Sequence, residues 1–280
     1  MSIVNTNMPV FVIGAPKCGS TSLHVALSKT GLFDYPKIKD THYLKNPKFN
    51  ISEYSKFFEC NGKRIFEVDQ NLAIHPEAFS NIFSNFTGAS IVYIIREQED
   101  RFFSAYKFLI KMGLRFKTFD DAVKNEYNWM ISHGLYSRNI RNFFSNEFVG
   151  DNRLIIVKFE CLVASDGITY RALMKLLNVD VGSTDVLPKR NESLSARSPA
   201  LVRGLSLLLN VLNPYLPASV IGVAKTSKLI QKLLFYRSNK IVVDRSVFGL
   251  YAALFRDSGT LVDRLNFRNG IALVSRDECK

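Results

Sequence analysis

Four short apolar segments in the first 160 residues have the pattern of buried β-strands. They are rich in Val, Ile and Phe, and they are PVFVIG (Pro9–Gly14), RIFEV (Arg64–Val68), SIVYIIR (Ser90–Arg96) and RLIIVKFE (Arg153–Glu160). Runs that are apolar throughout, without a polar residue at every second position, are typical of strands covered on both faces. The pattern therefore predicts a parallel sheet in the interior of the protein.

Stretches with helical patterning separate these strands. The expected helices are Ser20–Lys29, His75–Phe83, Glu99–Met112 and Leu135–Phe144. Gly31 follows the first of them and Gly113 follows the third, as glycine commonly does where a helix ends. Alternation of strand and helix predicts an α/β fold whose crossover connections are right-handed.

The charge of the chain is strongly positive and unevenly distributed. Its 280 residues include 37 Lys and Arg against 25 Asp and Glu, a net charge of +12. The segment Leu187–Val243 has nine basic residues and one acidic residue, and so supplies +8 of that total. This surplus indicates an anionic ligand, polymer or membrane surface. Residues 201–240 are apolar as well as basic, which fits a peripheral membrane contact or, as the preferred interpretation, core helices whose lysines reach solvent.

Composition excludes several classes of protein. Hydrophobic residues make up 47% of the chain and charged residues 22%, which is ordinary for a globular protein and not for a disordered one. The four cysteines are far apart and form no CxxC pair, so we expect no metal site. There is no signal-peptide pattern and no run of 18 apolar residues. We therefore expect a cytoplasmic protein that touches a membrane, if at all, from its surface.

The strongest local motif is VFVIGAPKCGSTSL, residues 10–23, which predicts a strand, a tight turn with two glycines and the start of a helix. Glycines let the backbone curl around a phosphate, and the free N–H groups of a helix N-terminus bind its charge. The motif differs from the nucleoside-triphosphatase loop GxxxxGK[ST], because Ser20 follows Gly19 and the lysine stands earlier, at Lys17. A P-loop kinase is the alternative enzyme, and the displaced lysine counts against it.

A second motif begins where the third predicted strand ends. Arg96 closes SIVYIIR, and Ser104 lies eight residues later in a predicted helix. A residue at the carboxyl end of a parallel strand faces the ligand crevice of an α/β sheet. Arg96 could therefore bind a phosphate through its guanidinium fork, with Ser104 as a second donor.

Together these motifs resemble the sulfotransferases that use 3′-phosphoadenosine 5′-phosphosulfate (PAPS), most closely the carbohydrate (heparan-type) and related bacterial branch. PKCGSTSL is similar to the family loop PKxGTTxL, which binds the 5′-phosphosulfate. REQEDRFFSAY is similar to the 3′-phosphate motif R(D/N)PxxRxxSxY, with Gln98 in place of proline. The likeness covers most of the chain and is weakest between residues 202 and 243. It implies a P-loop-like three-layer fold, with a central parallel sheet flanked by helices.

The resemblance also implies a donor site and a role for the loop lysine. Lys17 would offset the charge on the departing 3′,5′-bisphosphate, and no metal is required. Arg190, in the loop KRNESLSARS after the last of the predicted strands and helices, is a further candidate for the 3′-phosphate or for an anionic acceptor, with a solvated basic loop as the alternative. The donor-binding residues implied are Pro16, Lys17, Cys18, Gly19, Ser20, Thr21, Ser22, Arg96, Ser104 and Arg190.

On the acceptor side, KDTHYL resembles the family motif KExHF/Y, so Asp40 stands where a glutamate base is usual. We expect Asp40 to be the base, with His42 as the alternative, since an imidazole titrates near neutral pH. FEVDQNL resembles the family's GExSPxY and retains Glu67, which could bind the acceptor or orient the base, with a structural helix-cap partner as the alternative. The Ser-Pro pair is replaced here by Asp69 and Gln70.

We therefore expect one sulfotransferase domain over residues 1–280, with a PAPS-binding α/β core in 1–186 and a basic, mostly helical acceptor-side region or lid in 187–280. The expected activity is sulfuryl transfer from PAPS to a hydroxyl of a sugar, polysaccharide or glycolipid. Two enzyme alternatives are a phenolic or lipid acceptor and a P-loop kinase, and a relative that binds PAPS without efficient turnover is a third. A non-catalytic nucleic-acid binder would also explain the charge, but the chain has no RNP-like motif, so no nucleic-acid partner is expected.

Overall fold

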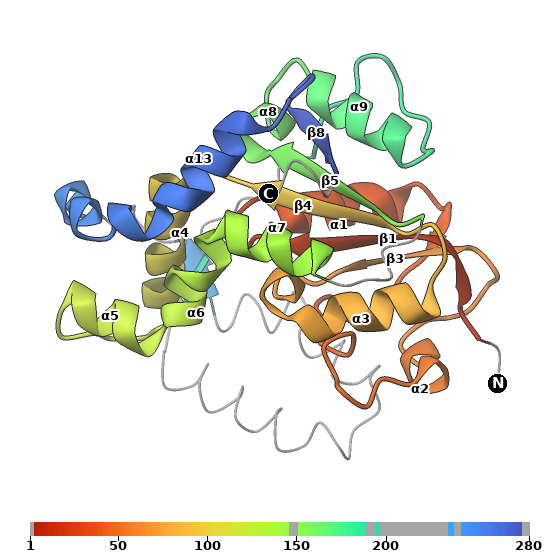
Figure 1. Cartoon of the computed structure of the whole chain (residues 1–280), viewed down its shortest axis with the longest axis horizontal. Helices are drawn as coiled ribbons and strands as arrows, with labels where there is room; N and C mark the ends of the chain where they lie inside the picture. The colour runs from red at the N-terminus through yellow and green to blue at the C-terminus, as the bar shows by residue number, and fades with distance from the viewer. Residues whose placement is uncertain (1–2, 146–150, 189–193, 197–234, 238–241, 276–280) are drawn as a thin grey trace.

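A six-stranded sheet lies at the centre of the fold, with its strands in the order β2-β3-β1-β4-β5-β8 (Figure 1). The computed structural model describes residues 3–145, 151–188, 194–196, 235–237 and 242–275. The strands of the sheet are β1 (Asn5–Gly14), β2 (Phe33–Asp34), β3 (Arg64–Val68), β4 (Ser90–Ile95), β5 (Arg153–Lys158) and β8 (Ile271–Val274). The first five are parallel to one another. The predicted α/β fold with buried parallel strands is thus confirmed.

Helices cover both faces of this sheet (Figure 1). On one face α3 packs against α7, where the rings of Phe79 and Phe143 meet edge to face with centroids 5.6 Å apart, and α1 covers the other face beside β3. The α-helices are α1 (Ser20–Lys29), α2 (Ile51–Ser55), α3 (Pro76–Asn85), α4 (Gln98–Lys111), α5 (Phe119–Asn125), α6 (Tyr127–Met130), α7 (Tyr136–Phe144), α8 (Phe159–Leu162), α9 (Ile168–Leu176) and α13 (Arg256–Arg264). The 3-10 helices are η1 (Leu72–Ile74), η2 (Ser132–Gly134), η3 (Arg245–Leu250) and η4 (Ala252–Phe255).

The core fixes the position of α4, the helix that follows Arg96. All six residues of β4 are buried, as expected for a strand with helices on both sides. The far side of α4 has its own apolar cluster, in which Phe102 packs against Phe255. Arg101 is fully buried and donates to the carbonyl oxygens of Trp129 and Met130. These contacts hold α4 firmly, so the residues on its opposite side have a fixed place relative to the sheet.

The C-terminal third differs in part from the mostly helical region that the sequence predicts. Strand β8 joins the central sheet and pairs antiparallel with β5, so the sheet is mostly parallel and this part of the chain contributes to the core. Its four residues, IALV, are too few to show the alternation of polar and apolar residues that predicts a strand. They pair with β5 only because the chain turns back to the sheet after α13. A separate pair, β6 (Leu194–Ala196) and β7 (Phe235–Arg237), is antiparallel.

The basic segment lies largely outside the described residues. Residues 189–193, 197–234 and 238–241 belong to the part that the structure does not describe. The predictions of a lid, of a membrane contact through 201–240 and of a role for Arg190 therefore fall there. Within the described part, none of the helices has the length and apolar character needed to cross a membrane.

Candidate functional site

The candidate residues gather at the carboxyl ends of neighbouring parallel strands. In the pairing of β1 with β3, Phe11 lies opposite Glu67 and Val12 opposite Val68. On its other side β1 pairs with β4. The loops that follow these three strands therefore meet at one edge of the sheet, where the N–H of Asp69 also donates to the carbonyl oxygen of Val12 at 3.0 Å. This edge is where ligands bind in open α/β sheets.

The loop between β1 and α1 has three backbone N–H groups without acceptors. Gly19 is the N-cap of α1 and has φ 81°, a left-handed conformation that glycine adopts without strain. The N–H groups of Gly19, Ser20 and Thr21 have no hydrogen-bond acceptor within the described ranges. They lie at the positive end of the α1 dipole, which favours a negatively charged ligand. The loop therefore has the donors that a phosphate or sulfate group needs.

The side chains of this loop divide between the interior and the surface. Pro16 and Cys18 are buried, so they face the protein core and shape the loop. Burial raises the pKa of the Cys18 thiol to about 12, which keeps it protonated. Ser20 and Ser22 are also buried, whereas Thr21 is exposed. Thr21 is thus the predicted loop hydroxyl that is most open to a ligand.

Lys17 lies over an aromatic ring among several positive charges. Its Nζ is 4.3 Å from the ring centroid of Phe108 on α4, and its φ of 70° places the backbone in the left-handed region. Burial, with repulsion from Lys111 and Arg96, lowers the pKa of Lys17 to about 8. The ammonium is therefore still mostly protonated at pH 7, and no carboxylate contributes to that pKa shift. An anion bound beside Lys17 would stabilise its ammonium in place of the water that burial has removed.

Arg96 stands at the end of β4 with part of its guanidinium unpaired. Its Nη1 donates to the carbonyl oxygen of Lys17 at 3.3 Å, and the guanidinium carbon lies 4.8 Å from the ring centroid of Phe159. The Asp100 carboxylate is 3.8 Å from Nη2, and Nε is buried without a partner among the described residues. Ser104 is half-buried on the following helix, and its hydroxyl has no hydrogen-bond partner among the same residues. Arg96 thus links the β1 loop to the end of β4 and retains capacity for an anion.

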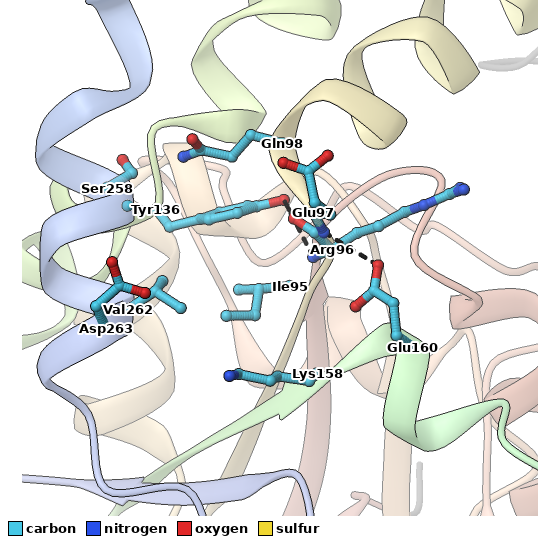
Figure 2. A pocket seen from close by; sticks show the side chains of 11 residues that line it. Ile95, Arg96, Glu97, Gln98, Tyr136, Lys158, Glu160, Ser258, Val262 and Asp263 are labelled. Carbon is cyan, nitrogen blue, oxygen red and sulfur yellow. Dashed lines mark hydrogen bonds between the residues drawn. The ribbon is translucent and has the colours of Figure 1, made fainter. Parts of the chain in front are cut away.

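A cavity of about 410 Å³ borders this strand end between β5, α7 and α13. Ile95, Tyr136 and Val262 form apolar walls. Figure 2 shows the Arg96 side chain running away from α13, past Glu160, which accepts a hydrogen bond from the backbone N–H of Glu97 at 3.1 Å. The cavity therefore lies on the side of the strand opposite the guanidinium.

Two buried carboxylates at the end of β3 hold the segment 40–43. Glu67 accepts hydrogen bonds from the backbone N and Oγ1 of Thr41, at 3.2 and 2.5 Å, and from the Tyr54 hydroxyl at 2.5 Å. Burial, together with the nearby Asp69 carboxylate, raises the pKa of Glu67 to about 7. Asp69 accepts from the backbone N of His42 and lies 2.9 Å from its Nδ1. Glu67 is therefore engaged with the protein, and it holds the backbone beside the acceptor-side candidates.

Asp40 and His42 both belong to this segment but have different partners. The Asp40 carboxylate is 2.8 Å from the Lys39 ammonium and accepts from the backbone N of Gln70 at 3.0 Å. The His42 ring contacts Asp69 and is 45% exposed. The structure thus brings the two candidate bases to the same sheet edge as Lys17.

Several residues of this site are outside the set that the sequence singled out. Phe108 supports Lys17, Phe159 lies beside Arg96, and Asp69 contacts His42. The two phenylalanines had no sequence signal, since single aromatic residues in apolar helices are ordinary core residues. Asp69 had a signal, because it departs from the pattern of the resembled family at a strand end. Arg190 lies outside the described residues.

The comparison with families identifies the enzyme class. Residues 7–185, which is more than half of the chain, match the sulfotransferase domain family. The chain belongs to this family. It is therefore a sulfotransferase, and the kinase alternative is set aside. The general donor of this family is PAPS. The match does not distinguish the carbohydrate branch from other branches.

One solved sulfotransferase structure shows the same fold, and two sulfotransferase domains have lower structural similarity. The sulfotransferase from Alicyclobacillus acidocaldarius has a TM-score of 0.54 and 20% identity, with 80% of this chain and 95% of that one covered. The sulfotransferase domain of the Synechococcus PCC 7002 olefin synthase has a TM-score of 0.44 and 14% identity, with 66% and 77% covered. The sulfotransferase domain from the curacin biosynthetic pathway has a TM-score of 0.46 and 15% identity, with 81% and 99% covered. A search of curated proteins gave no match.

The residues present fit the donor of the family. A bisphosphorylated nucleotide needs two separate anion sites, and the β1 loop and the guanidinium of Arg96, whose Nε has no partner among the residues that the structure describes, offer one each. Within the described ranges, no group of three or more His, Cys, Asp and Glu residues is placed to hold a metal ion.

Replacing Gly19 by alanine should impair binding of 3′-phosphoadenosine 5′-phosphate (PAP), the product of the donor. An added Cβ would lie 3.0 Å from the Phe159 ring, so the loop or the ring must move. A hydrogen bond to a charged group contributes about 1.5–3 kcal/mol, so displacing one loop amide should weaken PAP binding about tenfold or more. Isothermal titration calorimetry measures the change.

Gly31→Ala is the matched control. Gly31 also has a left-handed φ, +69°, but an added Cβ meets no atom within 4 Å. Both variants should lose about 1 kcal/mol of stability from backbone strain, and only Gly19→Ala should lose affinity. Equal PAP affinity in the two variants would contradict the placement of the phosphate at this loop.

Proposed function

We propose that this sulfotransferase moves a sulfuryl group from PAPS to a hydroxyl of a carbohydrate, polysaccharide or glycolipid. The observation that carries the donor side is the pair of anion sites at one sheet edge. One is the β1 loop, whose N–H groups have no acceptor in the described part of the chain, and the other is the guanidinium of Arg96. The carbohydrate class of acceptor rests on the resemblance of KDTHYL to the carbohydrate branch.

The two anion sites divide the charges of the donor. The backbone N–H groups of Gly19, Ser20 and Thr21 would hold the 5′-phosphosulfate at the start of α1. Arg96, together with the Ser104 hydroxyl from α4, would hold the 3′-phosphate. When bound, the donor supplies the activated sulfuryl group. The described residues give Lys17 no carboxylate partner, and the proposal explains this, because Lys17 would pair with the anionic donor.

Lys17 would stabilise the charge that develops on the leaving oxygen. Sulfuryl transfer, like phosphoryl transfer, depends on in-line positioning and on charge stabilisation at the departing group. The Phe108 ring keeps the ammonium in place before the ligand arrives. A preorganised donor of this kind contributes most where the site excludes water, and Lys17 is half-buried.

The base for the acceptor hydroxyl would come from the segment 40–42. Asp40 and His42 are the two candidates, and both lie in this segment at the end of β3. The acceptor would therefore approach from the β3 side of Lys17, while the nucleotide occupies the β4 side. In-line transfer needs the acceptor and the leaving group on opposite sides of the sulfur, and the proposal places them on opposite sides of Lys17.

Ligand-dependent stability tests the proposal. PAP at about 100 times its dissociation constant should stabilise the fold by about 2.7 kcal/mol, which raises the melting temperature by about 5 °C or more. ATP with Mg²⁺ at the same concentration should stabilise it much less, because it has no 3′-phosphate for Arg96. Equal stabilisation by ATP would contradict the donor assignment.

The acceptor class needs a separate measurement. Labelled PAPS is incubated with polysaccharides, glycolipids and simple phenols, and mass spectrometry detects an added sulfate. We expect transfer to the sugar-containing acceptors. Transfer to phenols alone would contradict the acceptor class and leave the donor assignment intact.

A further inference from the structure

The segment 40–43 has an unusual backbone that the end of β3 imposes. Asp40 and His42 have φ values of 57° and 58°, in the left-handed region that non-glycine residues rarely adopt. Such conformations persist only where the surrounding structure holds them. Here the holding contacts come from Glu67 in β3 and from Asp69, which directly follows the strand, and both carboxylates accept hydrogen bonds from this segment. The position of His42 is thus set by these carboxylates.

Asp69 contacts His42 twice, once at the backbone and once at the ring. One oxygen, Oδ2, accepts from the backbone N of His42 and lies 2.9 Å from Nδ1, and the other accepts from the backbone N of Asn71 at 3.0 Å. A carboxylate only accepts hydrogen bonds, so Nδ1 carries the proton and Nε2 has the free lone pair. Nε2 has no hydrogen-bond partner in the described part of the chain. The ring is therefore fixed in orientation and tautomer, with its basic nitrogen available.

We propose that Asp69 is a positioning residue that holds His42 as the base for the acceptor hydroxyl. This proposal rests on the proposed sulfuryl transfer and selects His42 over Asp40. The Asp40 carboxylate already forms an ion pair with Lys39 and accepts a hydrogen bond from the backbone N of Gln70. Asp69, which replaces the serine of the resembled motif, is fully buried and has no route to the acceptor itself.

The step balances in protons and electrons. The acceptor oxygen forms a bond to sulfur while its proton passes to Nε2 of His42. The bond from sulfur to the 5′-phosphate oxygen breaks, and its electron pair leaves with the bisphosphate beside Lys17. His42 becomes an imidazolium, which the Asp69 carboxylate stabilises across the Nδ1 hydrogen bond. The partly exposed ring then returns the proton to solvent.

The charges around the pair favour this role. The hydrogen bond to Asp69 raises the pKa of His42 above its usual value, against the opposing effects of burial and Lys45, while Asp40 adds a smaller increase. Burial alone would raise the pKa of Asp69, but its hydrogen bonds with His42 hold that pKa below the usual range. His75 is the other histidine near enough to sense both groups. His42 is therefore a stronger base than a free imidazole, and activity should fall as pH drops through its raised pKa.

Asp69→Asn tests the proposal, because asparagine keeps the size of the side chain and can still accept from the backbone N of His42. NMR of the ¹⁵N-labelled free protein gives the tautomer and titration of His42 without any substrate. We expect the Nδ1–H tautomer in the wild type and a titration midpoint that falls toward about 6.5 in the variant.

In transfer assays of Asp69→Asn the acidic limb of the pH–rate profile should shift to lower pH. Turnover should fall about 10- to 100-fold. This is less than the loss of about 10²- to 10⁴-fold expected when a general base is removed, because His42 itself remains. PAP affinity should not change.

His75→Gln is the matched control, since His75 lies near Asp69 and has no assigned role. It should leave the titration of His42 and the acidic limb in place. An unchanged His42 titration in Asp69→Asn would overturn the proposal. An Nε2–H tautomer in the wild-type protein would overturn it too, and this measurement does not depend on whether the variant folds. If the NMR results are as expected but the wild type transfers no sulfate from PAPS, the proposed function fails and His42 is not the base of that reaction.

Discussion

Replacing Lys17 by alanine is expected to lower turnover about 10²- to 10³-fold, the loss typical of removing one preorganised donor at a developing charge. The Lys17 ammonium lies over Phe108 and is mostly protonated at pH 7, and among the described residues it has no carboxylate partner to compete with the leaving group. Its loss should act mainly on the transition state, because the loop N–H groups still bind the 5′ end of the nucleotide. We therefore expect a large fall in kcat and a smaller change in PAP affinity. Transfer of labelled sulfate and calorimetry with PAP measure the two effects.

Lys29→Ala is a suitable control for the loss of a positive charge. Lys29 is exposed in the last turn of α1, the helix that Lys17 precedes, and it is at the end far from the loop. This variant should transfer sulfate at the wild-type rate. If Lys17→Ala retained wild-type turnover with an intact fold, Lys17 would have no part in the chemistry.

The central fold could be predicted because its signals are local. β1, β3, β4 and β5 are runs of apolar residues long enough to be recognised, and α1 begins and ends where the sequence places it. Two strands of the central sheet were missed for a common reason. β2 has two residues and β8 has four, so neither shows a period, and each exists because a neighbouring strand offers free backbone groups. Such pairing is decided by tertiary structure.

The candidate site was predictable to the extent that its residues are close in the sequence. The β1 loop and the strand end at Arg96 each lie within a short motif, and both occur at the predicted sheet edge. Asp69 and His42 are 27 residues apart, and their contact depends on how the segment 40–43 folds against β3. The side chain of Lys17 depends likewise on Phe108, which only tertiary packing brings to it. Sequence therefore names the residue types of the site, while partners and tautomers require the structure.

The surroundings of Arg96 show how a carboxylate can lie near an anion site without closing it. Asp100, one turn after Arg96, is only 3.8 Å from its Nη2. The same carboxylate is 2.8 Å from Nη2 of Arg245, whose Nε also contacts Glu99. Arg245 thus takes the stronger contact with Asp100, across a large separation in sequence. Arg96 is left with a loose ion pair that an incoming phosphate can replace.

Arg96→Met is accordingly expected to remove the preference for a 3′-phosphate. A hydrogen bond to a charged group contributes about 1.5–3 kcal/mol, which is about a 10- to 150-fold loss of PAP affinity. Adenosine 5′-phosphate lacks the 3′-phosphate, so its weaker binding should change little. Arg96 also contacts the β1 loop at the carbonyl oxygen of Lys17, so the variant could disturb the loop as well. A disturbed loop would weaken both ligands, so the ratio of the two affinities, measured by calorimetry, reports the contact of Arg96 with the 3′-phosphate alone.

Ser104→Ala and Arg141→Met complete the comparison. Ser104 offers one neutral donor from α4, so its loss should weaken PAP binding only about 2- to 10-fold, in line with about 0.5–1.5 kcal/mol for such a bond. Arg141 is exposed on α7, so Arg141→Met is a control for the loss of one positive charge. It measures how much the net positive charge of the protein attracts PAP at long range. It should leave the affinity ratio unchanged. If Arg96→Met lost PAP and adenosine 5′-phosphate equally, Arg96 would be a support for the loop, and the 3′-phosphate would bind elsewhere.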